Sequence, residues 1–91
     1  MSIAAEYWAW DAGGGNPFHR LALVVLAKFA DASNKVNIPT EAFTYYCAFD
    51  YGDVEPLLLY LEAEELIKIE EISPKNIKLS LLVRFYNEDG E

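Results

Sequence analysis

The sequence predicts one α+β domain in which three helices are followed by a β-hairpin, and three observations lead to this fold class. The 91 residues supply material for a single hydrophobic core. Apolar residues make up 53% of the chain, which is too large a share for a disordered segment. Apolar positions recur at helical spacing as far as Leu66, whereas short alternating or β-branched runs follow at 67–72 and 77–83.

The first fifteen residues are expected to form an aromatic arm and a glycine loop. The arm carries Tyr7, Trp8 and Trp10, and the loop is Gly13–Gly15, a run that regular elements tolerate poorly. At least one tryptophan is expected to pack on the first helix, in the core or in a dimer interface, because aromatic side chains bury large areas. The chain is thus divided into the arm and loop (1–15), the folded domain (16–86) and an acidic tail (87–91).

The first helix is predicted to begin at Asn16 and Pro17 and to run to about Asp31. An asparagine side chain can accept a hydrogen bond from a free amide of the first turn, and a proline at the first helical position loses no hydrogen bond. The segment Leu21–Ala27 is apolar on every face. One side must therefore meet the core, and the other must meet the aromatic arm or a second subunit.

The second helix is predicted to follow a polar turn at 32–37. It begins at Ile38–Glu41, where Pro39 or Thr40 suits the first turn and the carboxylate of Glu41 suits the positive end of the helix dipole. It ends near Cys47, which is expected to be a buried free thiol.

The start of the third helix depends on Pro56. With Asp50 as the cap, Pro56 lies in the helix interior and costs about 3 kcal/mol. With Asp53 as the cap, Pro56 falls in the first turn, where its missing N–H is harmless. The sequence therefore favours Asp53, followed by apolar residues at helical spacing: Val54, Leu57, Leu58, Leu61 and Leu66. Beyond this helix, Ser73–Asn76 is a turn signature that joins the two strand-like runs into a hairpin.

The charge and the composition exclude several classes of protein. Fifteen acidic residues against seven basic ones give a net charge of −8, which opposes a general affinity for nucleic acid or anionic membranes. The longest apolar run has seven residues, whereas a membrane span needs about 20. No signal-peptide pattern is present, so a soluble, intracellular protein is expected.

No catalytic, cofactor-binding or metal-binding residue is predicted, and the chain is not expected to be an enzyme. His19 is the only histidine, and no motif places a serine or cysteine beside it. Cys47 is the only cysteine, which excludes an internal disulfide and a cysteine-rich metal site. Gly13–Gly15 lacks the lysine and the preceding strand of a phosphate-binding loop.

The order of elements and a set of hydrophobic spacings, from Trp8 to Val83, carry a family likeness. The segments concerned are Trp8–Trp10, Arg20–Ala27, Ala30–Asp31, Ile38–Thr40, Val54–Leu58, Leu61–Glu62 and Leu66–Ile67. In these residues the chain resembles the N-terminal winged-helix domain of phage replication proteins and related phage and plasmid regulators. The resemblance implies a winged helix-turn-helix fold, with the third helix as the recognition helix and the hairpin as the wing.

The third helix departs from the family pattern in its charge. The family has a serine cap followed by basic or polar residues that place this helix in the major groove of DNA. Here Asp50 stands at the serine position, and Tyr51 and Gly52 stand where basic residues are usual. Glu65 replaces a glycine near the end of the helix. Eight carboxylates lie in this region, opposed only by Lys68: Asp50, Asp53, Glu55, Glu62, Glu64, Glu65, Glu70 and Glu71.

The chain is therefore predicted to be a small acidic protein of phage type that binds another protein. The predicted partner has a basic surface, as on a host or phage nucleic-acid-binding factor, which the chain inhibits or modulates as a DNA mimic in the manner of anti-CRISPR proteins. Its site of action is then the cytoplasm of the bacterial host cell. The predicted partner-binding residues are Asp50, Tyr51, Asp53, Glu55, Leu59, Tyr60 and Glu62. An ordinary solvated surface is the alternative explanation of the carboxylates.

Exposed apolar side chains support a protein partner. Leu57, Leu59 and Tyr60 cannot all face the core of a three-turn helix. Three tyrosines surround the turn before this helix: Tyr45, Tyr46 and Tyr51. One of them is expected in the core, and the other two are expected to be interface anchors.

The second hypothesis is a DNA-binding transcription or replication regulator that contacts DNA through its wing. Lys75, Lys78 and Arg84 form a cationic strip, and no acidic residue lies between Ile72 and Tyr86. Nucleic acid is the less favoured partner, because three charges release few counterions from DNA. Whether the chain forms a homodimer stays open.

Overall fold

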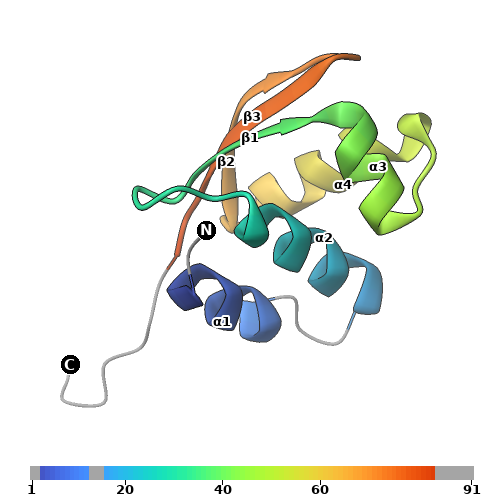
Figure 1. Cartoon of the computed structure of the whole chain (residues 1–91). Coiled ribbons are helices and arrows are strands. Elements are labelled where there is room, and N and C mark those ends of the chain that lie inside the picture. The colour runs from blue at the N-terminus through green and yellow to red at the C-terminus, as the bar shows by residue number, and fades with distance from the viewer. Residues whose placement is uncertain (1–2, 13–15, 84–91) are drawn as a thin grey trace, which may run out of the picture.

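The computed structural model describes residues 3–12 and 16–83, in which four helices pack beside a three-stranded antiparallel sheet. The elements are α1 (Ile3–Ala12), α2 (Pro17–Lys28), β1 (Lys35–Pro39), α3 (Thr40–Cys47), α4 (Tyr51–Ala63), β2 (Ile67–Ile72) and β3 (Asn76–Leu81). The strand order is β1-β3-β2, and the helices gather at one side of the sheet (Figure 1). This α+β arrangement confirms the predicted class and is compatible with a small winged-helix-like fold.

The segment predicted as an aromatic arm forms a helix, α1. Ala5, Trp8 and Ala9 of α1 are buried, and they lie at the spacing that places side chains on one helix face. α1 lies alongside α2 (Figure 1), and the small alanines allow the two helices to approach closely. The expectation that at least one tryptophan is buried is confirmed by Trp8, whereas Trp10 is 55% exposed. The predicted glycine loop lies outside the described residues.

α2 begins as predicted and ends three residues earlier than predicted. Oδ1 of Asn16 accepts hydrogen bonds from the backbone N of Phe18 at 2.9 Å and of His19 at 3.2 Å, and Pro17 occupies the first helical position. All residues from Ala22 to Ala27 are buried. The apolar segment is covered on more than one side, because α1 packs against it as well as α3.

The segment predicted as a polar turn contains a strand. β1 pairs with β3, and the side chains of Val36 and Ile38 are buried on the inner face of the sheet. Before it, the carboxylate of Asp31 accepts hydrogen bonds from the backbone N of Lys35 at 3.0 Å and of Ser33 at 2.8 Å, and these bonds lower the pKa of Asp31. The partner strand lies some forty residues away in the chain, so local sequence signals detected the turn and missed the strand.

α3 ends at Cys47 as predicted, but the prediction for the start of α4 is wrong. α4 begins at Tyr51 with Asp50 as the N-cap, so Pro56 lies inside the helix. The backbone N of Asp53 already donates to the carbonyl oxygen of Asp50 at 2.9 Å. Gly52 and Pro56 are both exposed, so water can solvate the Gly52 carbonyl that the proline leaves without a helical partner.

The hairpin forms as predicted and is tied to α3, although β3 begins one residue before and ends two residues before the predicted run of 77–83. The hydroxyl of Thr40 donates to the carbonyl oxygen of Ser73 at 2.7 Å, and the backbone N of Thr40 donates to the carbonyl oxygen of Lys75 at 3.1 Å. The pairing of β2 with β3 shifts register between Ile69 and Glu71, which marks a β-bulge. One hydrophobic core joins both layers, and its largest fully buried side chains are Phe43, Leu23, Leu26, Ile38, Leu58, Leu61, Ile67, Ile77 and Leu79.

Candidate docking surface

The acidic side chains predicted to bind a partner lie exposed on the first turns of α4. Asp50, Asp53 and Glu55 are all exposed, and within residues 3–12 and 16–83 none of them forms an ion pair. Between Lys35 and Lys68 the sequence contains no lysine, arginine or histidine. The carboxylates are therefore not neutralised by their own chain along α3 and α4.

Apolar side chains lie among these carboxylates. Leu59 is 50% exposed and Tyr60 is 47% exposed, while Leu57 is half-buried, so the expectation that they cannot all face the core is confirmed. The ring of Tyr60 lies against that of His19, with 4.5 Å between the ring centroids. Tyr51 is also exposed, at the first position of α4. We call Asp50, Tyr51, Asp53, Glu55, Leu59 and Tyr60 the α4 surface.

Glu62, the seventh predicted partner-binding residue, is engaged within the fold. Its side chain is half-buried, and its Oε2 accepts a hydrogen bond from the backbone N of Ile69 at 2.8 Å. This bond satisfies an amide of strand β2 next to the bulge and ties the strand to α4. The structure therefore gives Glu62 a role in holding the edge of the sheet.

Glu62→Ala is expected to lower the free energy of unfolding by about 1–3 kcal/mol, because it leaves a partly buried amide without an acceptor. Glu62→Gln keeps an acceptor oxygen and is expected to lose less than Glu62→Ala. Urea denaturation followed by circular dichroism measures both. Glu55→Ala removes an exposed carboxylate of the same helix that has no such bond, and it is expected to stay within about 0.5 kcal/mol of the wild type. Equal losses for Glu62→Ala and Glu55→Ala contradict the assignment.

The three tyrosines near the α3–α4 turn are all exposed, so the prediction that one of them is in the core is wrong. Phe43 occupies the core position of α3 instead, and it is completely buried. The rings of Tyr45 and Tyr46 meet edge to face with 5.4 Å between centroids, and Tyr46 also contacts Phe29 at 6.1 Å.

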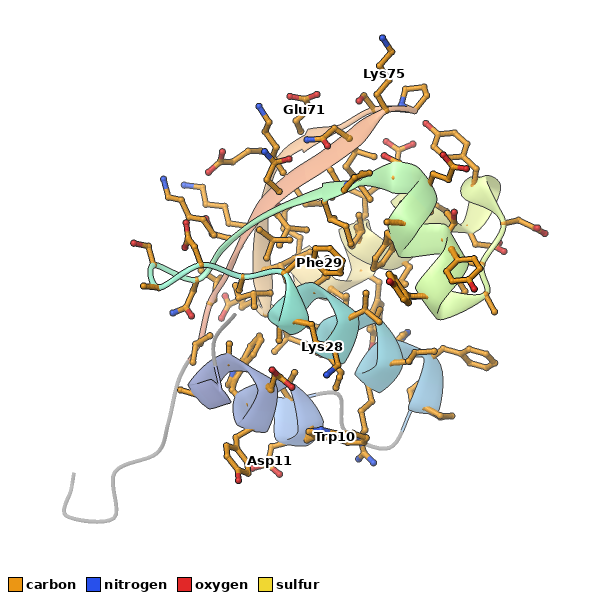
Figure 2. All side chains as sticks on the ribbon, in the orientation of Figure 1. Trp10, Asp11, Lys28, Phe29, Glu71 and Lys75 are labelled. Atoms are coloured by element: carbon orange, nitrogen blue, oxygen red, sulfur yellow. The ribbon has the colours of Figure 1, made fainter. Side chains whose placement is uncertain are left out.

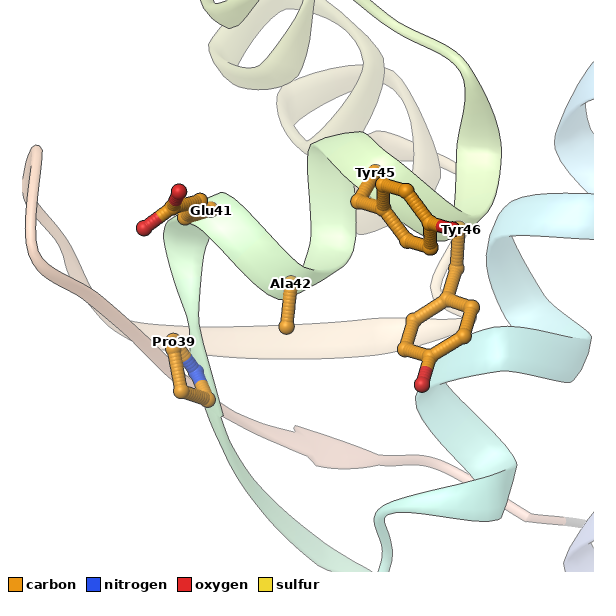
Figure 3. Close-up of a pocket in the computed structure, with 5 residues that line it drawn as sticks. All are labelled: Pro39, Glu41, Ala42, Tyr45 and Tyr46. Atoms are coloured by element: carbon orange, nitrogen blue, oxygen red, sulfur yellow. The ribbon is translucent and has the colours of Figure 1, made fainter.

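An open cleft of about 320 Å³ lies along α3, at residues outside the predicted partner-binding set. Its lining residues are Pro39, Glu41, Ala42, Tyr45 and Tyr46 (Figure 3). Glu41 and Tyr45 stand four positions apart, and Ala42 and Tyr46 likewise, which places each pair on neighbouring turns of one helix face. This four-residue spacing is visible in the sequence and indicates that the two pairs share one helix face.

The described lysines of the alternative DNA contact lie on the hairpin. Lys75 stands in the hairpin turn, and Figure 2 shows it extending with Glu71 from the end of the hairpin, away from the helices. Lys78 is exposed on β3, where Glu71 is its partner on β2. Arg84 lies outside the described residues.

The sheet brings two further lysines to the face that carries Lys78. Ile77, Leu79 and Leu81 point to the core, so Lys78 and Ser80 point outwards. Ser80 is flanked by Lys35 of β1 and Lys68 of β2. Lys35 and Lys68 are far apart in the sequence, and only the strand order places them on one face.

One side chain with a reactive group, that of Cys47, lies in the core. Cys47 is a buried free thiol, as predicted, and burial raises its pKa to about 12, so it is protonated at neutral pH and a poor nucleophile. In the part of the chain that the structure describes, no three His, Cys, Asp or Glu side chains are grouped so as to hold a metal ion. No described helix is long and apolar enough to cross a membrane.

Comparison of the chain with protein-family models, with curated proteins and with solved structures finds no match.

Proposed function

We propose that the chain is a protein-binding module with a winged-helix-like fold, whose α4 surface docks on a basic surface of a partner protein. α3 and α4 stand in the place of the helix-turn-helix, and α4 in that of the recognition helix. The observation that carries the proposal is the absence of any basic residue between Lys35 and Lys68 in the sequence. It is joined by the exposure of Asp50, Asp53 and Glu55, which form no ion pair within residues 3–12 and 16–83.

The chemistry of this surface suits a protein and opposes DNA. Carboxylates facing phosphate repel it, whereas carboxylates facing a cluster of arginines and lysines steer association and select the partner. Tyr51, Leu59 and Tyr60 supply apolar area, and tyrosine is among the residue types that carry most of the binding free energy at interfaces. A DNA-binding groove of a phage or host protein has this complementary charge, so we propose that the chain inhibits or modulates such a factor in the bacterial cytoplasm by covering its groove.

Capture from a bacterial lysate with competition by DNA tests this function. The biotinylated full chain is expected to retain nucleic-acid-binding proteins, identified by mass spectrometry, and a short DNA duplex is expected to displace them. Changing Asp50, Asp53 and Glu55 together to lysine is expected to lower their recovery at least tenfold, because three attractions become repulsions.

The matched control changes Asp11, Glu64 and Glu70 to lysine, three exposed carboxylates outside the α4 surface. It alters the net charge by the same amount and is expected to retain most of the captured protein. Equal loss in the two variants, or captured proteins that DNA fails to displace, refutes the proposed mode.

Contact with nucleic-acid phosphates through the sheet is a second candidate, favoured by the clustering of Lys35, Lys68 and Lys78 on its outer face. Fluorescence anisotropy of a labelled DNA duplex distinguishes it from the first. Binding that weakens with salt, and whose salt dependence falls when the three lysines are changed to alanine, supports this function. Absence of binding at low salt ends it.

A further inference from the structure

The cleft along α3 has a charged end and an aromatic end. Figure 3 shows Glu41 and Pro39 at one end, Tyr45 and Tyr46 at the other, and Ala42 between them. The cleft has a volume of about 320 Å³ and is shallow and widely open to solvent, so a bound segment lies along the surface. None of these five residues belongs to the α4 surface.

The aromatic end is held in place by ring contacts. Tyr46 contacts Phe29 of the α2 C-cap, with ring centroids 6.1 Å apart, and the ring of Tyr45 stands at 77° to that of Tyr46. Tyr45 is nevertheless 78% exposed. The two rings therefore form an accessible aromatic wall that carries hydroxyl donors at its edges.

The first two backbone positions at the floor of the cleft offer no free N–H to an added strand. Pro39 has no N–H, and the N–H of Thr40 already donates to the carbonyl oxygen of Lys75 at 3.1 Å. Addition of a β-strand at this place is thereby disfavoured. A polyproline II segment needs no strand pairing, and its solvated carbonyl groups can accept from tyrosine hydroxyls.

Glu41 adds a requirement for a positive charge. It is exposed, and within the described residues no lysine or arginine forms an ion pair with it. It stands four positions before Tyr45, a separation of about 6 Å along the helix axis. A polyproline II chain covers about 6–9 Å in two or three residues. A guanidinium suits this end, because it pairs with carboxylates in a planar fork.

We propose that the α3 cleft binds an extended segment of another protein in which an arginine lies two or three residues from a proline. The proline packs on the rings of Tyr45 and Tyr46, and the arginine pairs with Glu41. This site shares no residue with the α4 surface, so an experiment that refutes one proposal does not refute the other.

Selection from a phage-displayed library of random dodecapeptides on the full chain tests the cleft. Peptides that carry arginine and proline at this spacing are expected to be enriched. A synthetic peptide of the selected sequence is expected to shift the amide resonances of Glu41, Ala42, Tyr45 and Tyr46 in ¹H–¹⁵N spectra. Absence of enrichment, enrichment of peptides without arginine or lysine, or shifts confined to other elements overturns the proposal.

A double-mutant cycle then tests the charged contact. Glu41→Gln and an arginine-to-glutamine change in the peptide are each expected to weaken binding at least fivefold, and together they are expected to cost little more than either alone. Tyr45→Ala is expected to weaken binding by a similar factor, whereas Tyr7→Ala, which removes an exposed tyrosine from α1, leaves binding unchanged. Additive losses in the cycle refute the Glu41 contact. A dimer in sedimentation that Tyr45→Ala dissociates assigns the cleft to a second copy of the chain and refutes the peptide site.

Discussion

Trp8→Ala is expected to lower the free energy of unfolding by about 3–5 kcal/mol, the usual loss when a large buried aromatic side chain is removed. Trp8 is only 5% exposed and belongs to the core, where α1 packs against α2. The flanking Ala5 and Ala9 are too small to fill the resulting cavity. Such a loss is a large fraction of the stability of a typical domain. Urea denaturation followed by circular dichroism measures it.

Trp10→Ala is the matched control. Trp10 is on the outer side of α1, where its ring lies 5.8 Å from the guanidinium carbon of Arg20. Loss of this exposed cation–π contact is expected to cost no more than about 1 kcal/mol. Each variant leaves a single tryptophan, so fluorescence adds an independent test: acrylamide should quench Trp8 in the Trp10→Ala protein less than Trp10 in the Trp8→Ala protein. Equal stability losses and equal quenching mean that α1 is not docked on α2.

Pro56→Ala is expected to raise the free energy of unfolding by about 2 kcal/mol. Alanine restores an N–H that can donate to the Gly52 carbonyl oxygen in the second turn of α4, and a proline in a helix interior costs about 3 kcal/mol. The gain is reduced by about 0.4–1 kcal/mol, because alanine makes the unfolded chain more flexible. The same denaturation experiment measures the increase.

Pro74→Ala is the control of opposite sign. Pro74 follows Ser73 in the hairpin turn, a position that favours proline, so its removal is expected to destabilise the protein by about 0.4–1 kcal/mol. A destabilised Pro56→Ala protein contradicts the claim that Pro56 lies inside α4 at a cost to stability. A stabilised one shows that Pro56 is retained at a cost to the fold, on the exposed side of the helix that carries the α4 surface. Lysate capture with the Pro56→Ala protein then measures whether the proline ring contributes to docking.

Helix boundaries that depend on local chemistry were predictable. Asn16 and Pro17 start α2 because the capping bond and the proline geometry involve only neighbouring residues. The hairpin turn at Ser73–Asn76 is local in the same way. The start of α4 was not predictable in this way. The cost of a proline inside a helix favoured Asp53 as the N-cap, but solvent access to Gly52 reduces that cost.

The candidate sites also combine features that depend on neighbouring residues with features that depend on tertiary contacts. Asp50, Asp53 and Glu55 could be placed in one exposed region because they are close in the sequence and polar, although the predicted helix start left Asp50 before the helix. The bond from Glu62 to Ile69 could not be foreseen, since it depends on how α4 approaches strand β2. For the α3 cleft, the four-residue spacing of the lining side chains is visible in the sequence, whereas the contact of Tyr46 with Phe29 depends on how two helices pack.

By itself, the sequence determined the α+β class, the hairpin, the buried apolar helix α2 and the negative charge of α3 and α4, because spacing, capping and charge are properties of neighbouring residues. Only the tertiary structure decided that the N-terminal aromatic segment is a helix of the core, that β1 joins the sheet, and that Lys35, Lys68 and Lys78 share one face. Each of these depends on pairing or packing between residues distant in the chain, and such contacts override local propensity.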